Sequence, residues 1–184
     1  RYLFAPFEPG FGVGSGGGVQ RTDLQTGLTT TIVNPGNQTF IRGDASRWTP
    51  WGSYLTAEED WSAVSGGIRH GRLFELTNPV ATAGDATSNF VQRNVLPRVS
   101  HEGLVFDKDN NLYFIDEFNG GSIYKYTSSN PNATNGDDFF ASGQTFAAKV
   151  NGGGNSNAVG NIVWTPITDG SGGILAGVTQ TTDG

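Results

Sequence analysis

The sequence predicts an all-β protein, and its composition and strand pattern both indicate this fold class. Gly accounts for 28 of the 184 residues, and charged residues make up only 15% of the chain. Short runs rich in Val, Ile, Thr and aromatic residues alternate with clusters of Gly, Asn, Asp and Pro, which is typical of strands joined by turns. With 35% hydrophobic residues, we expect a single domain over residues 1–184.

The expected strands follow one another along the whole chain. The runs 19–24 and 28–33 are separated by three residues that include Gly27, which indicates a hairpin. Further strands are expected at 53–57, 72–76, 103–106, 112–115, 122–126, 145–150, 161–165 and 174–179. The segment 128–136, SSNPNATNG, has the composition of a long exposed loop.

Strands at this spacing occur in sandwiches, barrels and propellers. Residues 103–114 place two apolar strands on either side of an Asp/Asn turn, and 121–126 would form the next strand outward. This is most of a four-stranded blade, so we expect a β-propeller. Blades of about 40 to 45 residues give about four in this chain, fewer than most closed rings hold. We therefore expect part of a propeller, incomplete at its C-terminus.

Charge and composition exclude several classes of partner. The net charge of −6 and the 11 scattered basic residues disfavour a nucleic acid, which binds mainly through clustered Lys and Arg. No run of about 18 apolar residues occurs, so no segment is expected to span a bilayer. Because the sequence contains no Cys, it has neither a disulfide framework nor a thiolate metal site.

Acidic residues recur beside the expected strands. Glu58, Glu59 and Asp60 are consecutive, and two of them can reach one site if the strand ends or bulges there. Glu102 begins one strand, and the pair Asp116 and Glu117 ends the next. Carboxylates at the ends of neighbouring strands converge, and their repulsion is costly unless a cation or a proton intervenes. The pattern predicts a metal site with oxygen ligands, although exposed acidic residues are more often only a solvated surface.

The segments TPWGSYLTAEED (49–60) and SHEGLVFDKDNNLYFIDEFNGGSIYKY (100–126) resemble the PhoX-type alkaline phosphatase family. Members of this family carry Thr-Pro-Trp-Gly before Glu-Glu, then His-Glu, a strand ending in two acids, and a Gly-Gly turn. The similarity covers residues 43–126. It implies a secreted six-bladed propeller that binds calcium and iron and hydrolyses phosphate esters.

By motif position, the resemblance implies that Glu58, Glu59 and Glu102 are metal ligands, with Asp116 or Glu117 as a further ligand. The family's iron-binding Cys, upstream of the Glu pair, is missing here, where Gly43, Asp44, Ala45 and Ser46 stand. Calcium is therefore the expected cofactor, while an iron site would lack its Cys ligand and the site as a whole could be degenerate. Ligands that the family takes from later blades are also outside these 184 residues, so we expect no activity from them alone.

Three function classes remain open at this level. The first is a secreted metal-dependent phosphatase acting on a small phosphate ester. The second is a non-catalytic extracellular module that binds calcium or assembles with itself or with the remainder of a longer chain. The third is a gluconolactonase-like hydrolase, a propeller that uses a Glu at a strand start before Gly and a single divalent ion; Glu102 and Gly103 with Asp116 resemble it more loosely.

Overall fold

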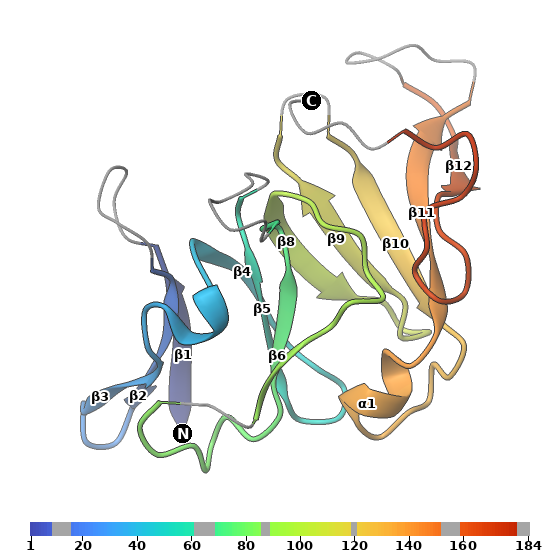
Figure 1. Cartoon of the computed structure of the whole chain (residues 1–184). Coiled ribbons are helices and arrows are strands. Elements are labelled where there is room, and N and C mark those ends of the chain that lie inside the picture. Colours follow the sequence, from blue (N-terminus) through green and yellow to red (C-terminus); the bar gives the residue numbers. More distant parts are fainter. Residues whose placement is uncertain (9–15, 61–68, 86–88, 119–120, 152–158, 180–184) are drawn as a thin grey trace.

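The computed structural model describes residues 1–8, 16–60, 69–85, 89–118, 121–151 and 159–179, and it confirms the all-β class (Figure 1). The strands form three antiparallel sheets. The first contains β1 (Tyr2–Phe7), β2 (Gly18–Asp23) and β3 (Thr29–Val33); the second contains β4 (Gly43–Trp48), β5 (Tyr54–Glu58), β6 (Leu73–Leu76) and β7 (Phe90–Gln92). The third contains β8 (His101–Phe106), β9 (Leu112–Asp116), β10 (Ile123–Ser128), β11 (Gly143–Val150) and β12 (Ile162–Pro166).

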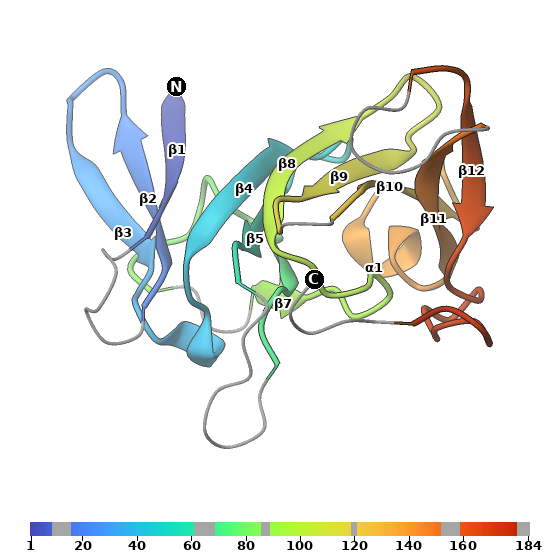
Figure 2. The same ribbon diagram turned by 90° about the horizontal axis from the view of Figure 1, so that it is seen from above.

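Within each sheet, every strand pairs with the next one along the chain. The first strands of the three sheets lie near one another, because β4 contacts both β1 and β8. Figure 2 shows the three sheets side by side, with β4 next to β8 and the later strands of the third sheet further from β4. The chain therefore brings the starts of consecutive sheets together.

The second sheet is buried on both faces. Leu55, Ala57 and Leu73 pack into a core shared with the third sheet, which supplies residues such as Phe114 and Tyr126. The neighbouring side chains of β5 and β6 point the other way, since successive residues of a strand alternate between faces. These residues, Tyr54, Phe74 and Leu76, pack against the first sheet in a second core with Val19, Ile32, Val33, Phe40 and Phe90. Apolar contacts on both faces therefore fix the positions of all three sheets.

Two short helices lie between strands. The 3-10 helix η1 (Asn37–Thr39) precedes β4, and α1 (Gly136–Phe139) lies between β10 and β11. The side chain of Asn135 caps α1 by accepting a hydrogen bond from the backbone N–H of Asp138. The loop predicted at 128–136 is confirmed only for residues 129–135, since β10 extends to Ser128 and α1 begins at Gly136, and both of these end residues are buried.

The structure confirms the predicted hairpin, which is β2 and β3, and the strands corresponding to β5, β6 and β8 to β12. The sequence prediction missed β1, β4 and β7. The strand predicted at 174–179 is wrong: only Ile174 forms a bridge, to Thr168. A turn follows, closed by the Val178 N–H on the Leu175 carbonyl, and Gly177 has a φ of 85°.

The propeller remains a prediction, because the three sheets of the described residues do not close into a ring. We predicted about four blades, but the described residues form three sheets. The number is lower because the third sheet has five strands and takes up residues 101–166. Among the described residues, no helix is long and apolar enough to cross a membrane.

Candidate metal centre

Two matching bulges place acidic residues at the start of the second and third sheets. In β4, Gly43 pairs with Glu58 and Ser46 with Thr56, so the segment containing Asp44 carries one extra residue. In β8, His101 pairs with Asp116 and Leu104 with Phe114, so Glu102 lies in an equivalent bulge. Bulges redirect side chains and are common next to functional sites. The two sheets therefore present one acid each from the same structural position.

Each partner strand ends in a pair of acids, and the second acid of each pair lies just beyond the strand. Glu59 follows β5, and Glu117 follows β9. The backbone of Ser100 links them: Glu117 donates its N–H to the Ser100 carbonyl, and Glu59 forms an isolated antiparallel bridge with Ser100. The loop before β8 thus holds the ends of β5 and β9 together.

Five carboxylates gather at this place, in two overlapping groups. Glu59, Glu102 and Glu117 form one group, and Glu8, Asp44 and Glu59 form the other; within each group the ligand atoms lie within 4.8 Å of one another. Glu59 belongs to both groups. It is half-buried, as is Asp44, while Glu8, Glu102 and Glu117 are exposed. We refer to these five residues as the acidic cluster.

The acidic cluster strongly favours the protonated form of Glu59. A hydrogen bond with Glu8, burial, and a hydrogen bond with Glu117 raise the pKa of Glu59 to about 9 from its usual 4.5. Burial and the charge of Asp44 raise the pKa of Glu102. Burial also raises the pKa of Asp44, although its hydrogen bond with Glu102 acts in the opposite direction. These carboxyl groups need protons or cations to remain so close.

The donor set of the acidic cluster fits a hard cation. All five side chains offer carboxylate oxygens, the ligands that calcium and magnesium prefer, and calcium accepts six to eight of them in flexible geometry. Within the described residues, no Lys, Arg or His forms a salt bridge with any of the five. No His or Cys belongs to either group. The cluster could therefore bind a metal ion, and it offers only oxygen donors.

Glu58 lies in a different environment from Glu59. Its carboxylate is fully buried and accepts hydrogen bonds from the backbone N–H groups of Ile41 and Arg72, at 3.2 and 3.0 Å. The Arg72 guanidinium pairs with both oxygens, and His70 Nδ1 lies 3.0 Å from Oε1. Burial raises the pKa of Glu58, but the bonds from His70 and Arg72 outweigh it, and the pKa is lowered.

Asp116 is the counterpart of Glu58 in the third sheet and also binds its own scaffold. Its Oδ1 accepts hydrogen bonds from the backbone N–H groups of Ser100 and Phe118, at 3.1 and 3.2 Å. Burial raises the pKa of Asp116, and these two bonds oppose the rise. Among the described residues, neither Glu58 nor Asp116 belongs to a group with metal-ligand spacing. Their role as ligands stays a prediction.

The structure thus brings three of the five predicted residues together: Glu59, Glu102 and Glu117. Sequence reasoning missed Glu8 and Asp44. Glu8 follows β1, a strand that was not predicted, and Asp44 lies in the segment that stands in the family's Cys neighbourhood. The signal available for both was position in the sequence: Asp44 lies within the first strand of the second sheet, and Glu8 directly follows the first strand of the first sheet.

His101 lies inside the core rather than in the acidic cluster. It is fully buried, and its ring contacts Phe114, with ring centroids 5.4 Å apart. Burial lowers the pKa of His101 to about 4, and the nearby charge of Glu58 offsets only part of this effect. His101 is therefore a neutral, buried side chain that packs against Phe114 and anchors the start of β8, directly before Glu102.

Comparison with known proteins identifies the family. The family model for alkaline phosphatase PhoX matches residues 44–183, which is more than half of the chain. The chain belongs to the PhoX family. The match begins at Asp44 and includes Glu59, Glu102 and Glu117, so four members of the acidic cluster lie within it. No curated protein and no solved structure matches the chain.

Proposed function

We propose that this PhoX family chain supplies calcium ligands to a metal-dependent phosphatase that hydrolyses small phosphate esters outside the cytoplasm. The observation that carries the proposal is the acidic cluster: five carboxylates from three sheets that crowd together without a basic partner in the described residues. PhoX membership makes the phosphate ester the favoured substrate class. In this proposal the three sheets are consecutive blades of a propeller, and the cluster lies near its axis.

The chain's own residues have separable roles. Glu59 lies in both groups, so it would bridge two ligand sets, while Asp44 and Glu102 reach the site from the two bulges. Glu58 and Asp116 hold the ends of β5 and β9 through backbone hydrogen bonds and so keep the second acid of each pair in place. Bound calcium would neutralise phosphate charge and stabilise negative charge that develops during ester cleavage.

The donor chemistry favours calcium over iron. Imidazole and thiolate ligands suit transition metals, whereas carboxylates suit calcium. The sequence has no Cys and two histidines. His101 is buried in the core, and His70 is buried beside Glu58. We therefore propose a calcium site without the iron that the family resemblance implies.

Calcium binding is the first test, and phosphate release is the second. The protein is freed of metal with a chelator and titrated with calcium, first as wild type and then as Glu59→Gln, Glu102→Gln and Glu117→Gln. Each variant should bind calcium about tenfold more weakly or worse, because each removes a charged ligand. Asp109→Asn is the matched control, since this carboxylate is exposed and pairs with Lys108 away from the cluster. Equal calcium affinity in all five proteins would refute the metal site.

Hydrolysis of p-nitrophenyl phosphate with added calcium then tests the phosphatase, and it is measured on the full-length protein because these 184 residues alone are expected to be inactive. Release that is lost in Glu59→Gln and kept in Asp109→Asn supports the proposal. Calcium binding without release favours the second candidate, a non-catalytic calcium-binding module, which the all-oxygen donor set also fits. Hydrolysis of a lactone substrate instead of the phosphate ester would favour the gluconolactonase-like alternative.

A further inference from the structure

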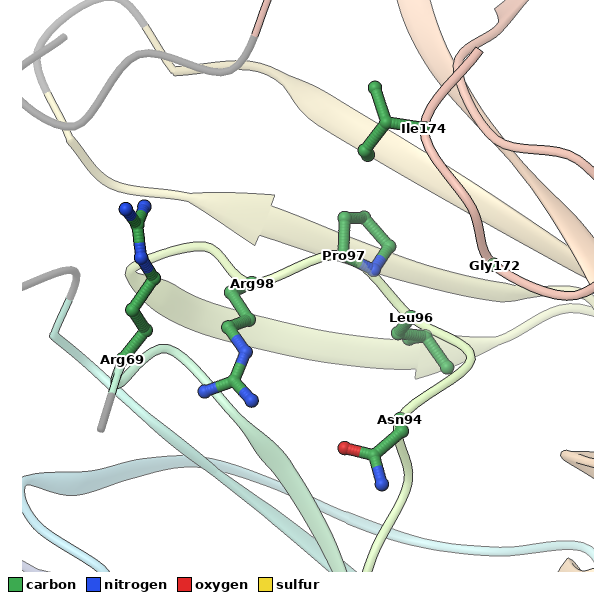
Figure 3. A pocket seen from close by; sticks show the side chains of 7 residues that line it. All are labelled: Arg69, Asn94, Leu96, Pro97, Arg98, Gly172 and Ile174. Atoms are coloured by element: carbon green, nitrogen blue, oxygen red, sulfur yellow. The ribbon is translucent and has the colours of Figure 1, made fainter. Parts of the chain in front are cut away.

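A cavity of about 310 Å³ is lined by none of the five residues of the acidic cluster. It is lined by Arg69, Asn94, Leu96, Pro97, Arg98, Gly172 and Ile174. Figure 3 shows Arg69 and Arg98 on one side of it and Pro97, Leu96 and Ile174 on the other, with the Asn94 amide on the side of Arg98. The cavity therefore has a polar, positively charged part and an apolar part.

The positive charge of this cavity is not neutralised by the described part of the chain. No carboxylate there forms an ion pair with Arg69 or Arg98. The sequence outside the described residues holds a single acid, Asp183. Nη1 of Arg98 is enclosed by protein and has no hydrogen-bond acceptor. A desolvated donor without an acceptor is costly, so this guanidinium is an unusual feature of a folded protein.

Neighbouring charges add to this cost. Burial lowers the pKa of Arg98, and the charges of Arg72 and Arg69 lower it further. Glu58 attracts Arg98, but its carboxylate is already occupied by Arg72 and His70. Arg98 thus lies near Arg72 and Arg69, and no carboxylate of the described residues forms an ion pair with it. An anion in the cavity would supply the missing charge, and arginine binds phosphate and carboxylate groups well.

We propose that this cavity binds a small organic anion, with its phosphate or carboxylate group at Arg98 and Arg69 and its apolar part against Leu96, Pro97 and Ile174. The cavity is larger than a bare phosphate ion, and an inorganic ion would make no apolar contact with Leu96, Pro97 and Ile174. Asn94 adds an amide that can donate to an oxyanion oxygen. The inference does not depend on metal binding at the acidic cluster.

The test measures binding of phenyl phosphate, benzoate and inorganic phosphate by calorimetry with a chelator present. The chelator removes calcium, so phosphate cannot bind through metal at the acidic cluster. Phenyl phosphate or benzoate should bind more tightly than inorganic phosphate, and the comparison of the first two identifies the preferred anionic group. Equal affinity for phenyl phosphate and inorganic phosphate would overturn the role assigned to the apolar wall.

Variants locate the site. Arg98→Gln and Arg69→Gln should each weaken binding by about tenfold or more, as expected for the loss of a charge-assisted contact. Arg47→Gln is the matched control, because Arg47 is an exposed arginine on β4 and its loss changes the net charge equally. Thermal unfolding confirms that each variant is folded, and Arg69→Gln, at an exposed position, serves if Arg98→Gln does not fold. Absence of binding by the wild type, or equal weakening in Arg47→Gln, would overturn the proposal.

Discussion

Glu58 and Arg72 form a buried two-point ion pair, from Nε to Oε2 at 2.9 Å and from Nη2 to Oε1 at 2.6 Å. The same guanidinium donates to the backbone carbonyls of Gln38 and Thr39, at 3.1 and 2.9 Å. One arginine just before β6 therefore ties the end of β5 to the 3-10 helix η1. The pair holds in place the residue that precedes Glu59.

We expect Glu58→Gln to lower the free energy of unfolding by about 3 kcal/mol, because it leaves the buried Arg72 charge uncompensated. Chemical denaturation of the chelated protein measures this loss. Asp109→Asn is the control, since Asp109 is exposed, lies outside the acidic cluster and should change stability little. A Glu58→Gln variant as stable as wild type would contradict the structural role. If Glu58 is also a ligand, as the family resemblance implies, calcium affinity falls in addition.

Calcium binding should release protons at neutral pH. The pKa of Glu59 is raised to about 9, so this carboxyl is protonated at pH 7 in the protein without metal. Calcium needs the ionised form and must displace the proton. Titrations in buffers with different ionisation enthalpies should show release of about one proton per binding event. Glu59→Gln removes the group, and a wild type whose binding heat is independent of the buffer would exclude this linkage.

The chelated protein should become less stable as pH rises. The folded pKa of Glu59, about 9, exceeds its usual 4.5, so folding favours the protonated state. This contribution is complete below pH 4.5 and is lost progressively as pH rises to about 9. Melting temperatures measured across this range should fall in chelator and fall less with calcium. Glu59→Gln should flatten the dependence in chelator; an unchanged slope in that variant would assign the effect to other groups.

Much of the fold follows from local sequence, while the acidic cluster follows only in part. Residues 103–126 contain alternating apolar residues and an Asp/Asn turn, so β8, β9 and β10 were predictable from pattern alone. β4 was missed because its sequence, Gly43 to Trp48, lacks apolar alternation: it contributes Ala45 to the core shared with the third sheet, and a bulge at Asp44 interrupts its pairing. The pairs Glu58–Glu59 and Asp116–Glu117 were recognised as acids at strand ends. Which acid of each pair turns toward the cluster depends on backbone partners that lie far away in sequence, such as Ile41 and Ser100.

The junction between the second sheet and the strand of Glu102 depends on Gly71. Gly71 has a φ of 78°, and a Cβ there would lie 2.6 Å from the Val99 carbonyl oxygen and 2.8 Å from that of Asp60. Its carbonyl also accepts the Val99 N–H, at 3.2 Å. Both clashes are with backbone atoms, so a side chain would separate the segment after β5 from the segment before β8.

Gly71→Ala should therefore destabilise the protein and weaken calcium binding, because Glu59 and Glu102 lie on either side of this junction. Gly52→Ala is the matched control: Gly52 has a similar φ of 87°, but a Cβ at this position would have no atom within 4 Å. The control should cost only the strain of a positive φ, about 1 kcal/mol, and leave calcium affinity unchanged. Gly71→Ala should cost more than that in chemical denaturation. Equal losses in the two variants would show that close packing at Gly71 does not set the geometry of the acidic cluster.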